Sequence, residues 1–415
     1  MAQIFPFRAV TPEPAAAAAV AAPPYDVVSA AEAATLATGN PVSFLRVSRA
    51  EIDLPAGTDP YSPAVYQQAA ATYARIKREA PLRQEPAPAL YVYSLVMNGR
   101  RQTGIGAVFS VDEYDGNIIK KHEKTRKDKE DDRTRHILEL QSQTGPVFLT
   151  CRPAAALTAL IEATLATPPH IDFTAADGIR HSLWRVTAPA GLAQIQSAFA
   201  AIPALYIADG HHRAASAARV REELRRRQGG KHTGSEEYNR FLAVCFPADQ
   251  LRILPYNRVV RDLNGLTAEQ FLAECRTRFA VTPAAGPEPR QPGVIHLFLE
   301  GRWWALDAAR LAAEAASPMD QLDVSLLQNH LLAPVLGIDD PRTSKRIDFI
   351  GGIRGTAVLE DKVGQGEAAA AFSMYPTTVE QLMAISDAGG IMPPKSTWFE
   401  PKLRDGLLCH ELAES

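Results

Sequence analysis

The residues with the clearest chemical potential are five consecutive ones, Asp209-Gly210-His211-His212-Arg213. The apolar run Ala204 to Ala208 precedes them and predicts a short buried strand, and Asp209-Gly210 is a strong turn signal. An alanine-rich stretch of high helix propensity follows from Ala214. The pattern predicts a strand–turn–helix junction, where the first helical N–H groups lack intrahelical partners and attract anions. An arginine and two histidines there add charge and donors suited to phosphate. The alternative is an aspartate cap beside two solvated imidazoles.

Two other segments carry polar groups in settings that suit a site. His122, Glu123 and Thr125 follow the apolar pair Ile118-Ile119, so they predict a strand-end cluster of imidazole, carboxylate and hydroxyl for acid–base or metal-facing chemistry. Pro23-Pro24 restricts the backbone before Tyr25 and Asp26. That rigid presentation fits either a functional site or a turn before a helix.

A proline-rich loop near the end of the chain is the third candidate. Residues 392–402 hold two lysines, two hydroxyl side chains and two aromatic rings between three prolines. Loops of this kind often carry function on a rigid scaffold, which makes Lys395, Ser396 and Thr397 candidates. The glycines of a Walker phosphate loop are absent, and the glycines of 351–355 lack the Rossmann order.

Composition excludes several classes of protein. The chain has 415 residues, 46% hydrophobic and 22% charged, with a net charge of −3, so it has ample core and no global attraction to nucleic acid or anionic membrane. The charged run 127–135 and the arginines after residue 218 indicate solvated helix faces. No stretch predicts a membrane span or a signal peptide. The four cysteines lie far apart with no C-x-x-C pair, which favours a reducing cytoplasm over a zinc knuckle or disulfide framework.

The elements that position these groups alternate irregularly between strand and helix patterns. Asn98-Gly99 and Glu300-Gly301 predict hairpins, and Ser29 with Glu32 predicts a capped helix start. Intermixed strands and helices with several hairpins predict an α+β (mixed α/β) fold with a mixed sheet. Pro283–Pro292 is the best linker candidate. We therefore expect a core domain over 1–282 and a C-terminal α/β part over 283–415, whose tail loop returns to the site.

Four of these segments together resemble a known family. Pro-Pro-Tyr-Asp-Val-Val, His-Glu-Lys-Thr, Ile-Ala-Asp-Gly-His-His-Arg and Met-Pro-Pro-Lys-Ser-Thr-Trp-Phe occur in this order in a bacterial family described as a domain of unknown function. The match covers nearly the whole chain, and the chain is identified as a member.

The box 209–213 also resembles the nucleotide-phosphate box of the ParB, sulfiredoxin and free serine kinase superfamily, and the serine kinase pattern is the most similar. The resemblance implies a ParB/sulfiredoxin-like core and a helix start that binds nucleotide phosphates through Gly210, His212 and Arg213. His211 stands where sulfiredoxins have their cysteine, which excludes sulfinic acid reduction. ParB's Glu-Arg pair and a following helix-turn-helix are absent.

The sequence thus predicts a cytoplasmic enzyme: an ATP- or ADP-dependent kinase of a small hydroxylated metabolite such as free L-serine, working with Mg²⁺. Gly210, His211, His212 and Arg213 are expected to bind phosphate. The expected catalytic residues are Asp209, which could also hold Mg²⁺, Lys395 as a mobile cation, and Glu123 or Asp26 as proton acceptor. Tyr25, His122, Thr125, Ser396 and Thr397 are expected at the substrate.

Two alternatives stay open. One is a ParB-like nucleotide-binding switch or binding module without turnover, against which near-neutral charge and the lack of a DNA-reading motif count. The other is hydrolysis of a phosphorylated metabolite at the same anion site.

Overall fold

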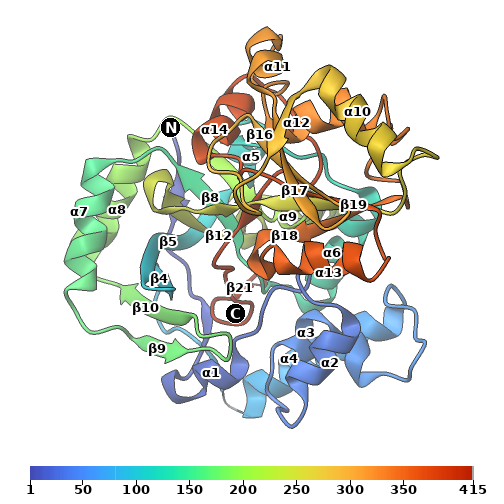
Figure 1. Ribbon diagram of the computed structural model, residues 1–415. Coiled ribbons are helices and arrows are strands. Elements are labelled where there is room, and N and C mark those ends of the chain that lie inside the picture. The colour runs from blue at the N-terminus through green and yellow to red at the C-terminus, as the bar shows by residue number, and fades with distance from the viewer. Residues whose placement is uncertain (80, 414–415) are drawn as a thin grey trace. The chain divides into compact units, whose positions relative to one another are not determined.

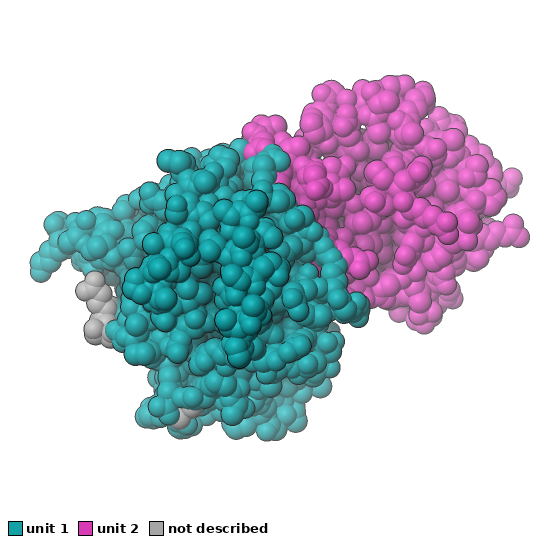
Figure 2. Space-filling view, turned by 90° about the vertical axis from the view of Figure 1, so that its left-hand side faces the viewer, with its two compact units in different colours: residues 1–251, 401–415 teal, residues 252–400 magenta. Residues whose placement is uncertain are grey.

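The computed structural model describes residues 1–79 and 81–413, and within them the chain divides into two compact units (Figure 1). The first unit comprises residues 1–251 and 401–415, and the second comprises residues 252–400, coloured separately in Figure 2. The chain therefore divides at residue 251 and not after residue 282. The segment 252–282 lies in the second unit because its strand pairs there, and Pro283–Pro292 connects two strands of that unit instead of linking domains.

A mixed sheet forms the centre of the first unit. Over the described residues it has nine strands in the order β6-β11-β8-β12-β5-β4-β10-β9, with β1 paired to β5. The pairs β11–β6 and β12–β8 are parallel and the others antiparallel. The strands are β1 (Ile4–Phe5), β4 (Leu90–Met97), β5 (Arg100–Ser110), β6 (Ile119–Lys120), β8 (Val147–Cys151), β9 (Ile171–Thr174), β10 (Arg180–Val186), β11 (Leu205–Asp209) and β12 (Arg240–Pro247).

Helices bury the apolar faces of this sheet. The main core joins side chains of β5, β8, β11 and β12 to those of α7, α8 and α9, and α7 and α8 lie side by side (Figure 1). A second cluster packs the N-terminal helices around Phe44 and Tyr73. The helices are α1 (Ala17–Val20), α2 (Ala30–Ala37), α3 (Leu45–Ser48), α4 (Pro63–Glu79), α5 (Val111–Asp115), α6 (Lys127–Leu140), α7 (Ala155–Leu165), α8 (Pro189–Ala200) and α9 (His211–Gln228).

The C-terminal tail is part of the first unit. Within 401–413, β21 (His410–Glu411) pairs with β7 (Ser142–Gln143), and Cys409 bonds to Val10 in both directions through the backbone. Val10 also begins β2 (Val10–Pro12), which pairs with β3 (Leu82–Gln84). The tail thus ties both ends of the first unit together.

The second unit has its own sheet, in the order β15-β17-β16-β19-β14-β18 over its described residues. Its strands are β13 (Ile253–Leu254), β14 (Tyr256–Val260), β15 (Ala280–Pro283), β16 (Val294–Leu299), β17 (Arg302–Asp307), β18 (Ile347–Gly351), β19 (Ala370–Ser373) and β20 (Trp398–Phe399). Its helices are α10 (Ala268–Arg278), α11 (Ala309–Glu314), α12 (Asp323–Leu327), α13 (Ala357–Gly364) and α14 (Val379–Asp387).

The predicted fold class is confirmed: helices and mixed sheets make an α+β protein. Asn98-Gly99 turns β4 into β5, and Glu300-Gly301 turns β16 into β17, each with positive φ at both turn residues, as such hairpins require. Ser29 and Glu32 form the predicted capping box at the start of α2. In the described part of the chain, no helix combines the length and hydropathy that crossing a bilayer requires.

Candidate functional site

The candidate site begins where β11 ends and α9 starts. Leu205 to Ala208 are buried, and Gly210 then takes the left-handed conformation with φ 89° and ψ 31°. A Cβ at Gly210 would lie in ordinary van der Waals contact, 3.4 Å from Nη1 of Arg213 and 3.5 Å from Cα of Val147, so the turn suits glycine because of its positive φ. The helix begins at His211, three residues before the alanine-rich stretch.

The start of α9 has no side-chain cap. This helix has 18 residues, and the first bond that closes it runs from the Ala214 N–H to the Gly210 carbonyl at 3.1 Å. The N–H groups of its first turn point along the helix axis, where the helix dipole concentrates partial positive charge. This end of α9 can therefore bind an anion through its backbone.

Lys402 supplies an ammonium group at the end of β11. Its Nζ donates to Oδ2 of Asp209 at 3.1 Å. Burial by itself raises the pKa of Asp209, but the cations Lys402 and Arg213 outweigh it and hold that pKa below its ordinary value. The sequence does not predict this role for Lys402, because no spacing or periodicity links residues so far apart.

Arg213 is buried and already engaged. Its guanidinium donates to the Pro146 carbonyl at 2.5 Å and contacts the Asp26 carboxylate at 3.3 Å, while Nε has no partner. Burial alone would lower the pKa of Arg213, but the carboxylates of Asp26 and Asp209 outweigh burial. The pKa is raised as a result, and the guanidinium stays charged. Arg213 thus connects the segment of Asp26 to the start of α9.

The imidazole rings of His122 and His211 are in edge-to-face contact. Their centroids are 4.4 Å apart at an interplanar angle of 86°, and both side chains are buried. Burial lowers the pKa of His122 to about 4, and burial together with the neighbouring His122 lowers that of His211 well below its ordinary value. Both imidazoles are neutral at neutral pH, so they offer hydrogen bonds there and not the charge expected from the sequence.

Glu123 and the backbone of His122 determine which nitrogen of the neutral His211 ring carries the hydrogen. The His122 N–H donates to Nε2 of His211 at 3.5 Å, so in the neutral ring Nδ1 carries the hydrogen. That Nδ1 lies 3.6 Å from Oε2 of Glu123, whose side chain is 48% exposed. Nδ1 of His122 is buried and has no hydrogen-bond partner.

The segment after Glu123 lies against the first turn of α9. The Arg126 N–H donates to Nε2 of His212 at 3.1 Å, and the Thr125 hydroxyl donates to the Glu130 carboxylate. Burial lowers the pKa of His212 as well, although nearby carboxylates oppose this effect. The structure thus brings His122, Glu123 and Thr125 to the start of α9.

Tyr25 is held from behind by an arginine. The Arg133 guanidinium lies 4.1 Å from the centroid of the Tyr25 ring, and Arg133 also donates to Asp132 at 2.9 Å. Tyr25 is 8% exposed, and burial raises the pKa of its phenol above the ordinary value. The Tyr25 phenol therefore stays protonated, and its hydroxyl can donate a hydrogen bond from a buried position.

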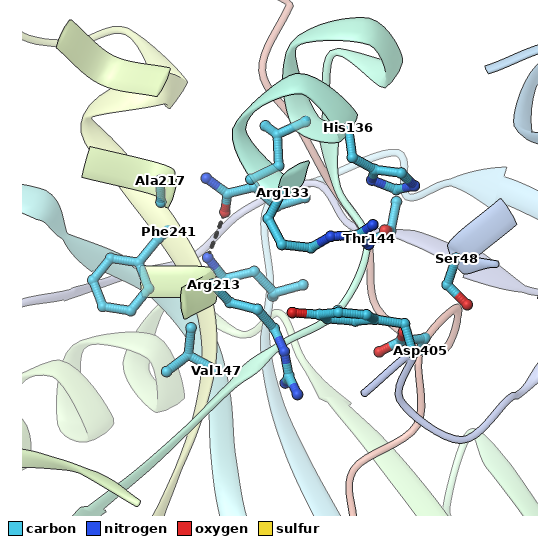
Figure 3. A pocket seen from close by; sticks show the side chains of 14 residues that line it. Ser48, Arg133, His136, Thr144, Val147, Arg213, Ala217, Phe241 and Asp405 are labelled. Atoms are coloured by element: carbon cyan, nitrogen blue, oxygen red, sulfur yellow. Dashed lines mark hydrogen bonds between the residues drawn. The ribbon is translucent and has the colours of Figure 1, made fainter. Parts of the chain in front are cut away.

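A small cavity of about 40 Å³ is lined by both polar and apolar side chains, Arg213 among them (Figure 3). Arg133 and His136 reach it from α6, and Asp405 faces it from the tail. Its volume is far below the several hundred Å³ that an organic ligand needs, so it suits ordered water. Burial, opposed by Arg213, raises the pKa of Asp405 to about 7.

The proline-rich loop belongs to the second unit up to Glu400. Lys395 is exposed, with Nζ 5.4 Å from the Tyr256 ring centroid, and its backbone has φ 56°. The Ser396 hydroxyl donates to the Pro393 carbonyl at 2.6 Å, and Thr397 follows it, half-buried. Roles for Lys395, Ser396 and Thr397 at the α9 site stay predictions.

The surroundings of Asp209 do not fit a resident magnesium ion. Its carboxylate is paired with Lys402 and faces Arg213, and both cations would repel a divalent ion. Across residues 1–79 and 81–413, no group of three or more His, Cys, Asp and Glu side chains is arranged to hold a metal.

Comparison with known proteins finds one family. The profile described as "Protein of unknown function (DUF1015)" matches residues 4–325. No curated protein matches the chain. Similar solved structures include a free serine kinase in complex with AMP, at 13% identity and TM-score 0.37 over 71% of this chain and 86% of that one. A conserved hypothetical protein from Pyrococcus furiosus has 14% identity and TM-score 0.35 over 73% and 93%. SbnI with a C-terminal truncation, from Staphylococcus aureus, has 13% and 0.39 over 73% and 86%.

Proposed function

The chain belongs to the family of proteins of unknown function DUF1015, and from its site we propose that it is a nucleotide-dependent phosphotransferase acting on a small hydroxylated metabolite. Free L-serine is the first substrate to test, with ATP or ADP as the phosphate donor and Mg²⁺ carried by the nucleotide.

One observation carries this proposal: an uncapped helix start that follows a buried strand through a left-handed glycine, with polar groups of three other segments gathered around it. Gly210 opens α9, Lys402 and Asp209 lie at the strand end, and His122 and Glu123 face His211. The resemblance of residues 209–213 to the serine kinase box supports the same assignment.

The helix start supplies the phosphate site. The backbone N–H groups of His211, His212 and Arg213 would donate hydrogen bonds to the phosphate oxygens. The neutral imidazoles add donors, and Lys402 adds positive charge beside Asp209. Phosphoryl transfer depends mainly on positioning and on stabilising the charge of the transferred group, which this arrangement can provide.

Glu123 is the better placed of the two candidate proton acceptors. It is exposed and lies beside the Nδ1–H of His211, whereas Asp26 is paired with Arg213. We assign the substrate's hydroxyl proton to Glu123 and the positioning of Arg213 to Asp26. Tyr25, His122 and Thr125 would then contact substrate.

The test is product formation by the purified full chain. It is incubated with MgATP or MgADP and L-serine, L-threonine or L-homoserine, and products are identified by mass spectrometry. Phosphoserine with equal nucleotide consumption supports the proposal. Nucleotide binding without product supports the switch, and nucleotide loss without a phosphorylated amino acid supports hydrolysis.

Matched arginine variants locate the activity. Arg213→Ala is expected to weaken nucleotide binding about tenfold or more in calorimetry, because the start of α9 loses its buried anchor. Arg180→Ala is the control, since Arg180 is an exposed arginine of the same unit paired with Asp172. Unchanged nucleotide affinity in a folded Arg213→Ala variant would contradict a nucleotide site at the start of α9.

A further inference from the structure

The second unit contains a larger cavity that the proposed phosphotransfer does not use. It measures about 270 Å³ and is lined by a buried arginine, an aromatic ring, apolar side chains and several polar ones, among them Arg258, Phe349, Leu332, Ile347, Pro393 and Pro394. We propose that this cavity is a binding site for a small organic carboxylate with an aliphatic or aromatic body. The proposal stands on the second unit alone.

Arg258 is a buried cation that no carboxylate neutralises. It lies on β14 with 3% exposure, and its guanidinium donates to two backbone carbonyls, those of Tyr256 and of Lys395, the latter at 3.1 Å. Within residues 1–79 and 81–413, no carboxylate forms an ion pair with Arg258. Burial lowers its pKa to about 10, which leaves it protonated at neutral pH. A buried charge without a counter-ion is costly, and a bound anion would relieve that cost.

The rest of the cavity favours an apolar ligand body. The guanidinium lies 5.4 Å from the centroid of the Phe349 ring. Leu332 and Ile347 are buried, and Pro393 and Pro394 form part of the wall. A volume of about 270 Å³ approaches the lower limit of known small-molecule sites. The site therefore joins one fork of charged donors to a surface that contacts hydrocarbon.

The charges around the cavity favour a carboxylate over a phosphate ester. Arg258 is the buried cation among its lining residues, whereas Arg342 is exposed and paired with Asp340 at 2.8 Å. Asp339 also lines the cavity and adds negative charge. A dianion would need a second cation and would be repelled by these carboxylates. A single carboxylate matches one guanidinium in charge and in two-point geometry.

The proline-rich loop gives this cavity a preformed wall. Lys395 holds a left-handed φ of 56°, uncommon for a residue other than glycine, and in this conformation its carbonyl accepts from Arg258. The Ser396 hydroxyl bonds back to Pro393, and the Thr377 hydroxyl donates to the Ser396 carbonyl at 3.0 Å. A rigid wall lowers the entropy that a ligand would lose on binding.

Binding is tested on the full chain with matched probes by ligand-observed NMR and calorimetry. Phenylacetate and isovalerate carry the predicted chemistry, phenylacetamide removes the charge, and phenyl phosphate replaces the head group. The carboxylates are expected to bind at least about tenfold more tightly than the amide and the phosphate, because only they match one buried guanidinium.

Three variants place the site. Arg258→Gln removes the charge, and Ile347→Phe fills the cavity while keeping the arginine, so the second remains informative if the first does not fold. Each is expected to weaken phenylacetate binding about tenfold or more. Arg276→Gln is the control, since Arg276 is an exposed arginine near the Trp304 ring and does not line the cavity.

The contrary results are equally definite. No binding of either carboxylate at millimolar concentration overturns the proposal, as does equal binding of phenylacetamide. Tighter binding of phenyl phosphate overturns the choice of head group. Unchanged affinity in folded Ile347→Phe overturns the location.

Discussion

Nζ of Lys402 lies 3.1 Å from Oδ2 of Asp209, and this ion pair attaches the C-terminal tail to the last residue of β11. Both side chains are largely covered, with 13% and 29% of their surfaces exposed. The pair therefore serves two ends: it stabilises the first unit, and it keeps a cation beside the start of α9.

Removing the cation should destabilise the first unit. In Lys402→Met the carboxylate of Asp209 stays partly buried without its partner, so the free energy of unfolding should fall by about 1–3 kcal/mol. Urea unfolding at neutral pH measures this change. The double variant Lys402→Met with Asp209→Asn should recover part of the loss, because no unpaired charge remains. Lys362→Met, at the pair of a half-buried lysine with the exposed Glu367, should cost less than about 1 kcal/mol. Equal losses in the two single variants would contradict the assignment.

Asp405 should make the protein less stable as pH rises from about 4 to about 7. Its pKa is raised from 3.8 to about 7 by burial, so between these values the folded state binds the proton and the unfolded state does not. Its contribution is fully present below about pH 4 and is lost by about pH 7, an effect on the order of 4 kcal/mol. Urea unfolding across this range should show the stability of the native protein, relative to Asp405→Asn, falling as pH rises. A constant difference would contradict the raised pKa.

His136 should act in the opposite direction. Burial, aided by Arg133, lowers its pKa from 6.5 to about 4, so the unfolded state binds the extra proton between these values. The stability that the neutral imidazole provides is present above about pH 6.5 and is lost as pH falls toward 4. In His136→Gln the acid-side decline of unfolding free energy should be flatter, by on the order of 3 kcal/mol over this range. An unchanged slope would show that His136 titrates normally.

Alanine variants of two glycines should distinguish the cost of a strained backbone from a loss of nucleotide binding. Gly210 and Gly178 have similar φ, 89° and 79°, but a Cβ at Gly210 meets Arg213 and Val147, whereas one at Gly178 meets nothing within 4 Å. Each alanine variant should lose about 1–2 kcal/mol of stability through φ alone. Only Gly210→Ala should also weaken nucleotide binding, by about tenfold or more, measured by calorimetry. Comparable nucleotide affinity in the two variants would count against the helix start.

Lys395 is predicted to act on turnover more than on nucleotide affinity. If its cation closes over the transferred phosphoryl group, Lys395→Met should lower kcat about a hundredfold while nucleotide Kd changes less than about threefold. Steady-state kinetics and calorimetry give the two numbers. A near-normal kcat would contradict this role, and the hydrogen bond from Arg258 to the Lys395 carbonyl would then indicate a structural role for the loop.

The sequence predicted the local elements well because they depend on neighbouring residues. The hairpin at Asn98-Gly99 follows from residues that tolerate positive φ, and the junction at Asp209-Gly210 follows from an apolar run before a turn signal. The family is likewise confirmed, since its motifs lie in contiguous stretches.

What the sequence did not predict depends on contacts between distant segments. Lys402 meets Asp209 only because the tail returns to the first unit. The charge of His122 and His211 is decided by burial and by each other's proximity, which residue type does not reveal. The division at residue 251 follows from the pairing of β14 with β18 and β19, for which no composition change gives a signal.

The return of the tail has a consequence for biosynthesis. The first unit is interrupted by residues 252–400 and includes 401–415, so β21, Lys402 and Asp405 emerge from the ribosome after about 150 intervening residues. At typical elongation rates the nascent first unit waits roughly 7–30 s for these residues. During that time its strands and α9 must persist without the tail, while the inserted second unit, contiguous in sequence, is free to fold as it is made. Chaperone capture in this interval would therefore fall on the part of the chain that was synthesised first.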